Sequence, residues 1–185
     1  MGRGPGGAGV KVNETERRNM SNQRPVILLD VDGVLNALSH HPRGWDDWRQ
    51  VNARHISIRY SPQMLARLQA LDADIVWHTT WRDAANEELA PVIGWDPLPV
   101  VPCDGWLWME PGWWKAPSAR AFIEADPRPF VWIDDDLGSA DPGEITWVQD
   151  YDYLLVQPTW EEGLQPASLT VIEDWVARRS TEVAA

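Results

Sequence analysis

The chain has 185 residues, of which 44% are hydrophobic, and this suits one domain with an ordinary core. Its net charge is −12. Residues 1–24 carry five basic against two acidic side chains, so the remainder carries −15 and should repel phosphate backbones over any extended surface. The single cysteine, Cys103, excludes an intrachain disulfide, and no apolar run is long enough to span a membrane, so we expect a cytoplasmic protein without a membrane partner.

The first 24 residues are rich in glycine and polar side chains and show no hydrophobic periodicity. Such a segment has too little apolar surface to bury, so we expect residues 1–24 to be a disordered leader. Residues 25–185 are then expected to form a single domain.

Residues 25–29 are apolar and lead directly into two aspartates, Asp30 and Asp32, and a glycine. This pattern predicts a buried strand whose carboxyl end delivers two acids into a turn, where open α/β sheets bind ligands. Carboxylates two residues apart on an extended chain project on the same side and repel unless a cation lies between them or one of them is protonated, and a divalent cation is the first expectation. An EF-hand calcium loop also begins Asp-x-Asp-Gly, but it needs ligands at positions occupied here by Val34 and His41.

The segment after this first strand is polar and aromatic, and we expect residues 36–60 to form a flap over the strand ends, with short strands at 49–51 and 56–59. Ser61 and Pro62 are typical of a helix N-cap and first turn, and the apolar residues that follow them recur at helical spacing. A helix should therefore return the chain to the sheet.

Strands and helices then alternate. We expect strands at 74–79, 99–102, 130–133 and 153–157, and helices at 82–89, 117–125 and 166–179, with Pro91 stopping the first of these helices. Polar side chains again stand where strands end or helices begin: Thr79 at a strand end, Lys115 just before a helix, and Asp134, Asp135 and Asp136 after a strand. The alternation predicts a parallel sheet with helices on both faces.

The order of these polar positions resembles the four motifs of the haloacid dehalogenase (HAD) superfamily of phosphohydrolases: Asp30-x-Asp32-Gly33, Thr79, Lys115 and the acidic run at 134–136. The resemblance covers most of residues 25–179. It implies a Rossmann-like three-layer α/β sandwich with a five-stranded parallel sheet in the order 5-4-1-2-3. No full cap domain fits between the motifs, which is typical of the capless or small-cap branch, so residues 25–185 would be one HAD-like catalytic domain with residues 36–60 as a minimal cap.

The resemblance also implies a role for each catalytic side chain. Asp30 would attack phosphorus and form an aspartyl-phosphate, and Asp32 would serve as general acid and then general base, which favours a phosphatase. Thr79 would donate a hydrogen bond to a phosphate oxygen, and Lys115 would stabilise charge on the transferring group.

Magnesium is the implied cofactor. Side chains of Asp30 and Asp135 with the carbonyl of Asp32 would supply its oxygen ligands, and Asp134 is a second candidate. Because three acids follow one another, the register among Asp134, Asp135 and Asp136 stays open at this point.

Thirteen tryptophans are unusual in a chain of this length, and several stand near the motifs. Indoles can offer a stacking surface for a base or sugar, but they fill cores more commonly, and core packing is the favoured interpretation.

Three functions remain open. The first is a Mg²⁺-dependent phosphomonoester hydrolase acting on a nucleotide or other small phosphate ester, whose partner would be that phosphorylated small molecule. The second is a phosphatase that processes RNA or DNA ends, which the acidic body disfavours unless the basic leader or a partner supplies affinity. The third is a catalytically idle binding module that keeps the HAD fold. The sequence indicates no oligomeric state.

Overall fold

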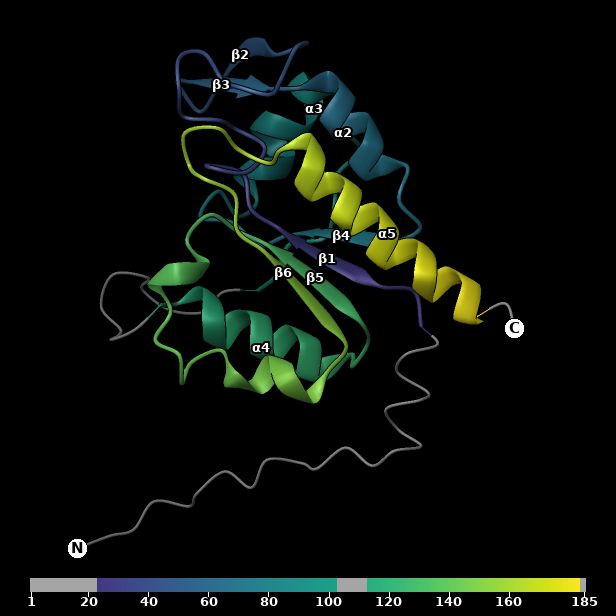
Figure 1. The fold of residues 1–185 in the computed structure, drawn as a ribbon. Helices are drawn as coiled ribbons and strands as arrows, with labels where there is room; N and C mark the ends of the chain where they lie inside the picture. The colour runs from purple at the N-terminus through teal and green to yellow at the C-terminus, as the bar shows by residue number, and fades with distance from the viewer. Residues whose placement is uncertain (1–22, 103–112, 184–185) are drawn as a thin grey trace, which may run out of the picture.

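The computed structural model describes residues 23–102 and 113–183. Figure 1 shows a central sheet with helices on both sides and a small hairpin beyond one end of the strands. The elements in chain order are β1 (Val26–Leu29), β2 (Arg49–Ala53), β3 (Ile56–Tyr60), α2 (Pro62–Gln69), β4 (Asp74–Trp77), the π-helix η1 (Ala85–Leu89), α3 (Ala90–Ile93), α4 (Lys115–Ala125), β5 (Phe130–Ile133), the 3₁₀ turns η2 (Leu137–Ser139) and η3 (Thr146–Asp150), β6 (Tyr153–Val156) and α5 (Pro166–Val183).

The main sheet has four parallel strands in the order β4-β1-β5-β6. The expected fifth strand at residues 99–102 is reduced to one parallel bridge, between Trp77 and Val100. Prolines 99 and 102 lack the N–H that a strand interior requires. Two backbone bonds remain, from Trp77 N to Pro99 O and from Val101 N to Trp77 O, both 2.8 Å long. The α/β class and the parallel sheet are confirmed, whereas the five-strand order is not established.

The strands are buried on both faces because successive side chains alternate between two cores. Ile27 and Leu29 of β1 pack on the face that α2 and α5 cover, whereas Val26 and Leu28 pack toward α4 and η3. This arrangement gives the three layers that the sequence predicts.

The helix boundaries follow local sequence signals in most places. Ser61 caps α2, since its hydroxyl accepts a hydrogen bond from Met64 N at 3.2 Å, as predicted. The prediction that Pro91 stops a helix is wrong, because Pro91 lies in α3, which continues directly from the π-helix η1. The chain instead leaves α3 at Gly94, whose φ of 77° suits glycine.

The expected flap contains an antiparallel hairpin of β2 and β3 beyond the carboxyl ends of the main strands (Figure 1). Its two-residue turn, Arg54-His55, has positive φ at both positions, which is the geometry of tight hairpin turns. The segment after β1 joins this hairpin through a hydrogen bond from Ala37 N to Arg59 O at 3.0 Å. The hairpin is thereby tied to the turn that follows the first motif.

Some predictions concern residues outside the described ranges: Cys103, nearly all of the leader, and two of the thirteen tryptophans, Trp106 and Trp108. Arg24, the last residue of the expected leader, forms ion pairs with Asp72 at 3.1 Å and Asp74 at 3.0 Å. Within the described ranges, no helix has the length and apolar character needed to cross a membrane.

Candidate active site

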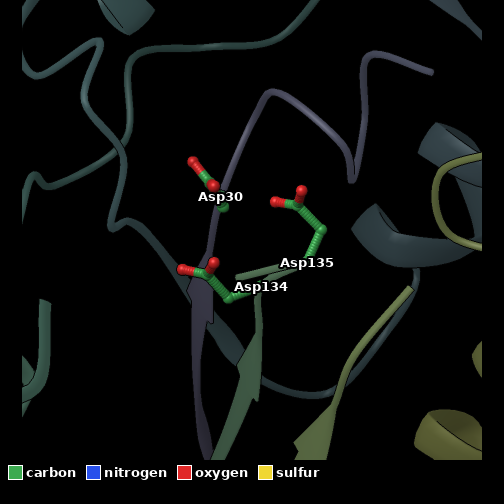
Figure 2. A group of neighbouring side chains, drawn as sticks. All are labelled: Asp30, Asp134 and Asp135. Atoms are coloured by element: carbon green, nitrogen blue, oxygen red, sulfur yellow. The ribbon is translucent and has the colours of Figure 1, made fainter. Parts of the chain in front are cut away.

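Three aspartates converge at the carboxyl ends of two adjacent strands. Asp30 follows β1, and Asp134 and Asp135 follow β5, so the pairing of these strands brings the side chains together (Figure 2). One carboxylate oxygen from each lies within 4.8 Å of the others. The prediction that the first and last motifs meet at one sheet edge agrees with this geometry.

Lys115 also reaches into the cluster, and it is the first residue of α4 and not, as predicted, a residue just before the helix. Its Nζ lies 2.6 Å from Asp30 Oδ2 and 2.6 Å from Asp134 Oδ2, and all three side chains are buried. Burial would lower the pKa of Lys115, but the charges of Asp30 and Asp134 outweigh it and hold this pKa above its usual value. The lysine is therefore a permanent ammonium shared by two carboxylates.

One ammonium does not neutralise three acids. Burial, followed by the charge of Asp30, raises the pKa of Asp134 to about 7 and that of Asp135 to about 6. Burial likewise raises the pKa of Asp30, against the opposing effect of Lys115. An excess of negative charge in a desolvated place is the environment that a divalent cation stabilises.

Thr79 completes this cluster from the end of β4. Its buried hydroxyl hydrogen-bonds to the Asp30 side chain, and the hydroxyl oxygen also accepts from Trp81 N at 3.3 Å. Asp30 Oδ1 accepts in addition from Val31 N at 2.7 Å. The Asp30 carboxylate is thus fixed from three sides by residues of three different segments.

Asp135 stands against the turn of the first motif. A Cβ at Gly33 would lie 2.3 Å from the Asp135 carboxyl carbon, and Gly33 has a φ of 71°. Only glycine satisfies both the backbone conformation and the close approach. The glycine of Asp-x-Asp-Gly therefore makes room for the acid from β5.

Asp136 lies apart from the other two acids of its run. It is exposed, accepts a hydrogen bond from Trp113 Nε1 at 3.2 Å and contacts the Ser139 hydroxyl. The backbone N–H of Asp136 donates to Asp134 Oδ1 at 3.0 Å. The structure thus groups Asp134 and Asp135, and not the Asp136 side chain, with Asp30.

Asp32 is not part of the three-aspartate cluster, and both of its carboxylate oxygens accept hydrogen bonds from other side chains. Its Oδ1 accepts from Asn36 Nδ2 at 2.7 Å, and its Oδ2 accepts from Trp81 Nε1 at 2.8 Å. Asn36 is buried and in turn accepts from Arg59 N of β3 at 2.9 Å. Asn36 was not among the predicted site residues, although an amide four residues after an acid can reach back to it across a turn.

His78, to which the sequence pattern assigned no role, lies beside the site in an aromatic setting. Its ring lies 5.4 Å from Trp132 and 5.8 Å from Trp114, and Nε2 hydrogen-bonds to Ser118 Oγ at 2.8 Å. Burial, with a further effect of Lys115, lowers the pKa of His78 to about 3. His78 is therefore neutral at pH 7 and is no second cation in the site.

Most described tryptophans pack in the core, which agrees with the favoured interpretation. Trp113 stacks on Trp132 at 5.1 Å and Trp77 on Trp95 at 5.5 Å. Trp113 also lines the site, with its ring centroid 5.9 Å from Lys115 Nζ. Indole packing thus builds the apolar wall that desolvates the lysine and its carboxylates.

The donor set suits a hard cation. Carboxylate oxygens of Asp30, Asp134 and Asp135 are the ligands that Mg²⁺ prefers, and the described residues offer no histidine or cysteine in this group. Because Asp135 is half-buried, one side of the cluster stays accessible for water or a substrate oxygen.

This fold and site define the class of protein as a member of the HAD superfamily. Within that superfamily, the family model for the HAD domain in Swiss Army Knife RNA repair proteins matches residues 26–169, and the chain belongs to this family. No curated protein and no solved structure matches the chain.

Proposed function

We propose that the protein is a Mg²⁺-dependent phosphomonoester hydrolase that works through an aspartyl-phosphate on Asp30. The observation that carries the proposal is the position of Asp30, which is buried at the end of β1 and bound by Lys115 and Thr79. A carboxylate held rigidly beside a cation can approach an anionic phosphate that it would otherwise repel. The superfamily is generally hydrolytic, which is consistent with this chemistry.

Magnesium would be held by side chains of Asp30 and Asp135 and by the carbonyl of Asp32, with Asp134 as a second candidate. When bound, it would neutralise negative charge between the nucleophile and the phosphate. Asp134 binds Lys115 in the structure, so this acid would both position the lysine and add charge for the cation.

The protein's own residues supply the remaining steps. An oxygen of Asp30 attacks phosphorus while the ester bond breaks, and Asp32 gives a proton to the leaving oxygen. Asp32 then takes a proton from the water that hydrolyses the acyl-phosphate, which returns Asp30 as a carboxylate and releases inorganic phosphate. Thr79 and Lys115 donate hydrogen bonds to the phosphoryl oxygens throughout.

For the substrate, we place the terminal phosphate of an RNA strand first, because the family description names RNA repair. The structure favours an uncapped site, since the described residues between the first two motifs form only a two-stranded hairpin and one core helix. A nucleotide or another small phosphate ester, the leading expectation from sequence, is the second candidate because the same site would admit it. The idle binding module is disfavoured by the joint presence of Asp30, Asp32, Thr79 and Lys115.

A phosphate-release assay tests the proposal. Phosphorylated RNA oligonucleotides, mononucleotides and sugar phosphates are incubated with and without Mg²⁺, and we expect metal-dependent release from at least one of them. Asp30→Asn keeps the side-chain shape but removes the nucleophile, so it should abolish release without unfolding the protein. A folded Asp30→Asn protein that retains substantial turnover would contradict the assignment of Asp30.

A further inference from the structure

One tryptophan does not follow the packing of the others. Trp160 is 53% exposed, the highest value for a tryptophan among the described residues, and it lies in the tight turn bridged by Thr159 and Gly163. A large indole left in water is a common mark of a binding surface. Leu38, which is 42% exposed, lies beside it, because Leu38 N donates to Trp160 O at 3.0 Å.

This exposed pair is attached to the catalytic end of the sheet at two points. Gln157, at the end of β6, donates from Nε2 to Asp135 O at 3.0 Å, and Leu164 N donates to Val34 O at 2.9 Å. Trp160 is three residues from Gln157, a reach of at most about 11 Å. Through Gln157 and its contact with the Asp135 backbone, the turn that carries Trp160 is attached to the same end of the sheet as the three acids.

An arginine borders the same segment from the other side. Arg59 of β3 holds residues 36–37 through its backbone, and its Nη2 lies 3.0 Å from His40 Nδ1. In the described part of the chain, the buried Nε of Arg59 has no hydrogen-bond partner, and the ion pairs recorded there do not include Arg59. A half-buried guanidinium without a counter-ion is a ready partner for a phosphodiester.

We propose that Trp160, Leu38 and Arg59 form a subsite for the strand next to the scissile phosphate of a single-stranded RNA end. The terminal base stacks on Trp160 against Leu38, and Arg59 binds a backbone phosphate. The subsite rests on the proposed phosphatase function and names the part of the substrate that the four motifs do not touch.

Charge near the subsite predicts how it binds. Glu161 and Glu162 follow Trp160, and Arg43, 3.7 Å from Glu162, offsets only one of these two charges, so the turn itself has no net positive charge. Stacking should then supply most of the affinity, with Arg59 as the main phosphate contact. The dependence of binding on salt should be shallow, equivalent to about one phosphate.

The test compares two substrates in one set of variants. RNA hexamers phosphorylated at the 5′ or the 3′ end carry bases, whereas glycerol 2-phosphate has no ring. Trp160→Ala should lower kcat/KM for the hexamer about tenfold and leave glycerol phosphate unchanged. Trp160→Phe should restore most of the loss, and Arg59→Gln should lower hexamer turnover alone. Val171→Ala and Arg178→Gln change exposed residues of α5 and should leave kcat/KM unchanged for both substrates.

Binding separates this proposal from the phosphatase proposal. Anisotropy of a labelled hexamer on the Asp30→Asn protein measures the subsite without turnover, and adding Trp160→Ala should weaken binding about tenfold. Release of phosphate by the wild type with no effect of Trp160→Ala on the hexamer overturns the subsite and leaves the phosphatase standing. Binding that depends on Trp160, without any phosphate release, supports the subsite and overturns the phosphatase proposal. An equal loss on hexamer and glycerol phosphate, or a wild type that does not bind the hexamer, also overturns the subsite.

Discussion

Removal of the Lys115 side chain should strongly destabilise the protein, because in the described structure it is the only cation in contact with two buried carboxylates. Lys115→Met leaves Asp30 and Asp134 without a counter-charge, and breaking a buried ion pair from one side costs about 3–5 kcal/mol. We expect a loss of that size in the free energy of unfolding, measured by urea denaturation in EDTA.

The matched control removes one of the partners as well. In the double variant Lys115→Met/Asp134→Asn, one buried charge is gone, so part of the lost stability should return. Additive effects of the two substitutions would show that the ammonium and the Asp134 carboxylate do not depend on each other.

His78 should make the protein sensitive to acid. Its pKa is lowered to about 3 in the fold, against 6.5 in an unfolded chain, so the unfolded state binds more protons between these values. This contribution to stability is complete above pH 6.5 and is lost as pH falls toward 3. At pH 5 the loss is about 2 kcal/mol.

The measurement is the free energy of unfolding of wild type and His78→Phe at pH 5 and pH 7.5. The difference between the two proteins should shift by about 2 kcal/mol in favour of the variant at the lower pH. His41→Gln, which changes an exposed histidine, serves as the control. An equal response of wild type and His78→Phe to acid would contradict the role of His78.

Some site residues can be predicted from the sequence and others cannot, and the difference has a physical reason. Asp30, Thr79 and Asp134 stand at strand ends, and a parallel sheet necessarily brings such ends to one edge. The contacts of Asn36 and His78 depend on tertiary neighbours, Arg59 in one case and Ser118 in the other, which no local pattern specifies.

At the scale of elements, the hairpin is coupled to the first motif through Asn36. This side chain joins the Arg59 backbone of β3 to the Asp32 carboxylate, so it acts as a positioning residue for the proposed general acid. Asn36→Ala should lower kcat about tenfold for an alkyl phosphate, whose leaving oxygen needs a proton, and much less for an aryl phosphate with an acidic leaving group.

A purely structural role for Asn36 predicts a different pattern. Loss of a buried hydrogen-bonded amide costs about 1–3 kcal/mol of stability, but this loss alone would lower the turnover of both substrates by the same factor. Asp32→Asn provides the reference, because it removes the acid itself and should show the same dependence on the leaving group with a larger fall. A uniform fall for Asn36→Ala would remove it from the chemistry.

Elements were predicted best where two signals coincide. The apolar run of β1 and the serine-proline start of α2 both appear in the structure. The errors involve proline: Pro91 lies inside the first turn of α3, and the residues beside Pro99 pair only through a bridge. Proline limits hydrogen bonding at its own position, but whether the neighbouring backbone still pairs depends on the tertiary contacts of that edge.

At the scale of the molecule, the acidic cluster links metal binding to stability. Asp30, Asp134 and Asp135 hold like charges within 4.8 Å, with Lys115 as their one counter-charge in the described cluster. The metal-free protein therefore carries repulsion that folding creates and that a cation would relieve. Binding only to the native state at one hundred times the dissociation constant adds about 2.7 kcal/mol. We expect millimolar Mg²⁺ to raise the Tm by about 5–10 °C.

Asp135→Ala separates this explanation from a general salt effect. It removes one repelling charge and one proposed ligand, so it should weaken the Mg²⁺-induced rise in Tm while keeping or raising the Tm of the metal-free protein. Asp136→Ala changes the neighbouring acid, whose side chain contacts Trp113 and Ser139 instead, and should keep the Mg²⁺ response. Scanning calorimetry of the three proteins in EDTA, Mg²⁺ and matched KCl provides the comparison. If Mg²⁺ does not change the Tm of the wild type, and Asp135→Ala lowers the stability of the metal-free protein without changing turnover, then the acidic run is structural and the proposed metal site is contradicted.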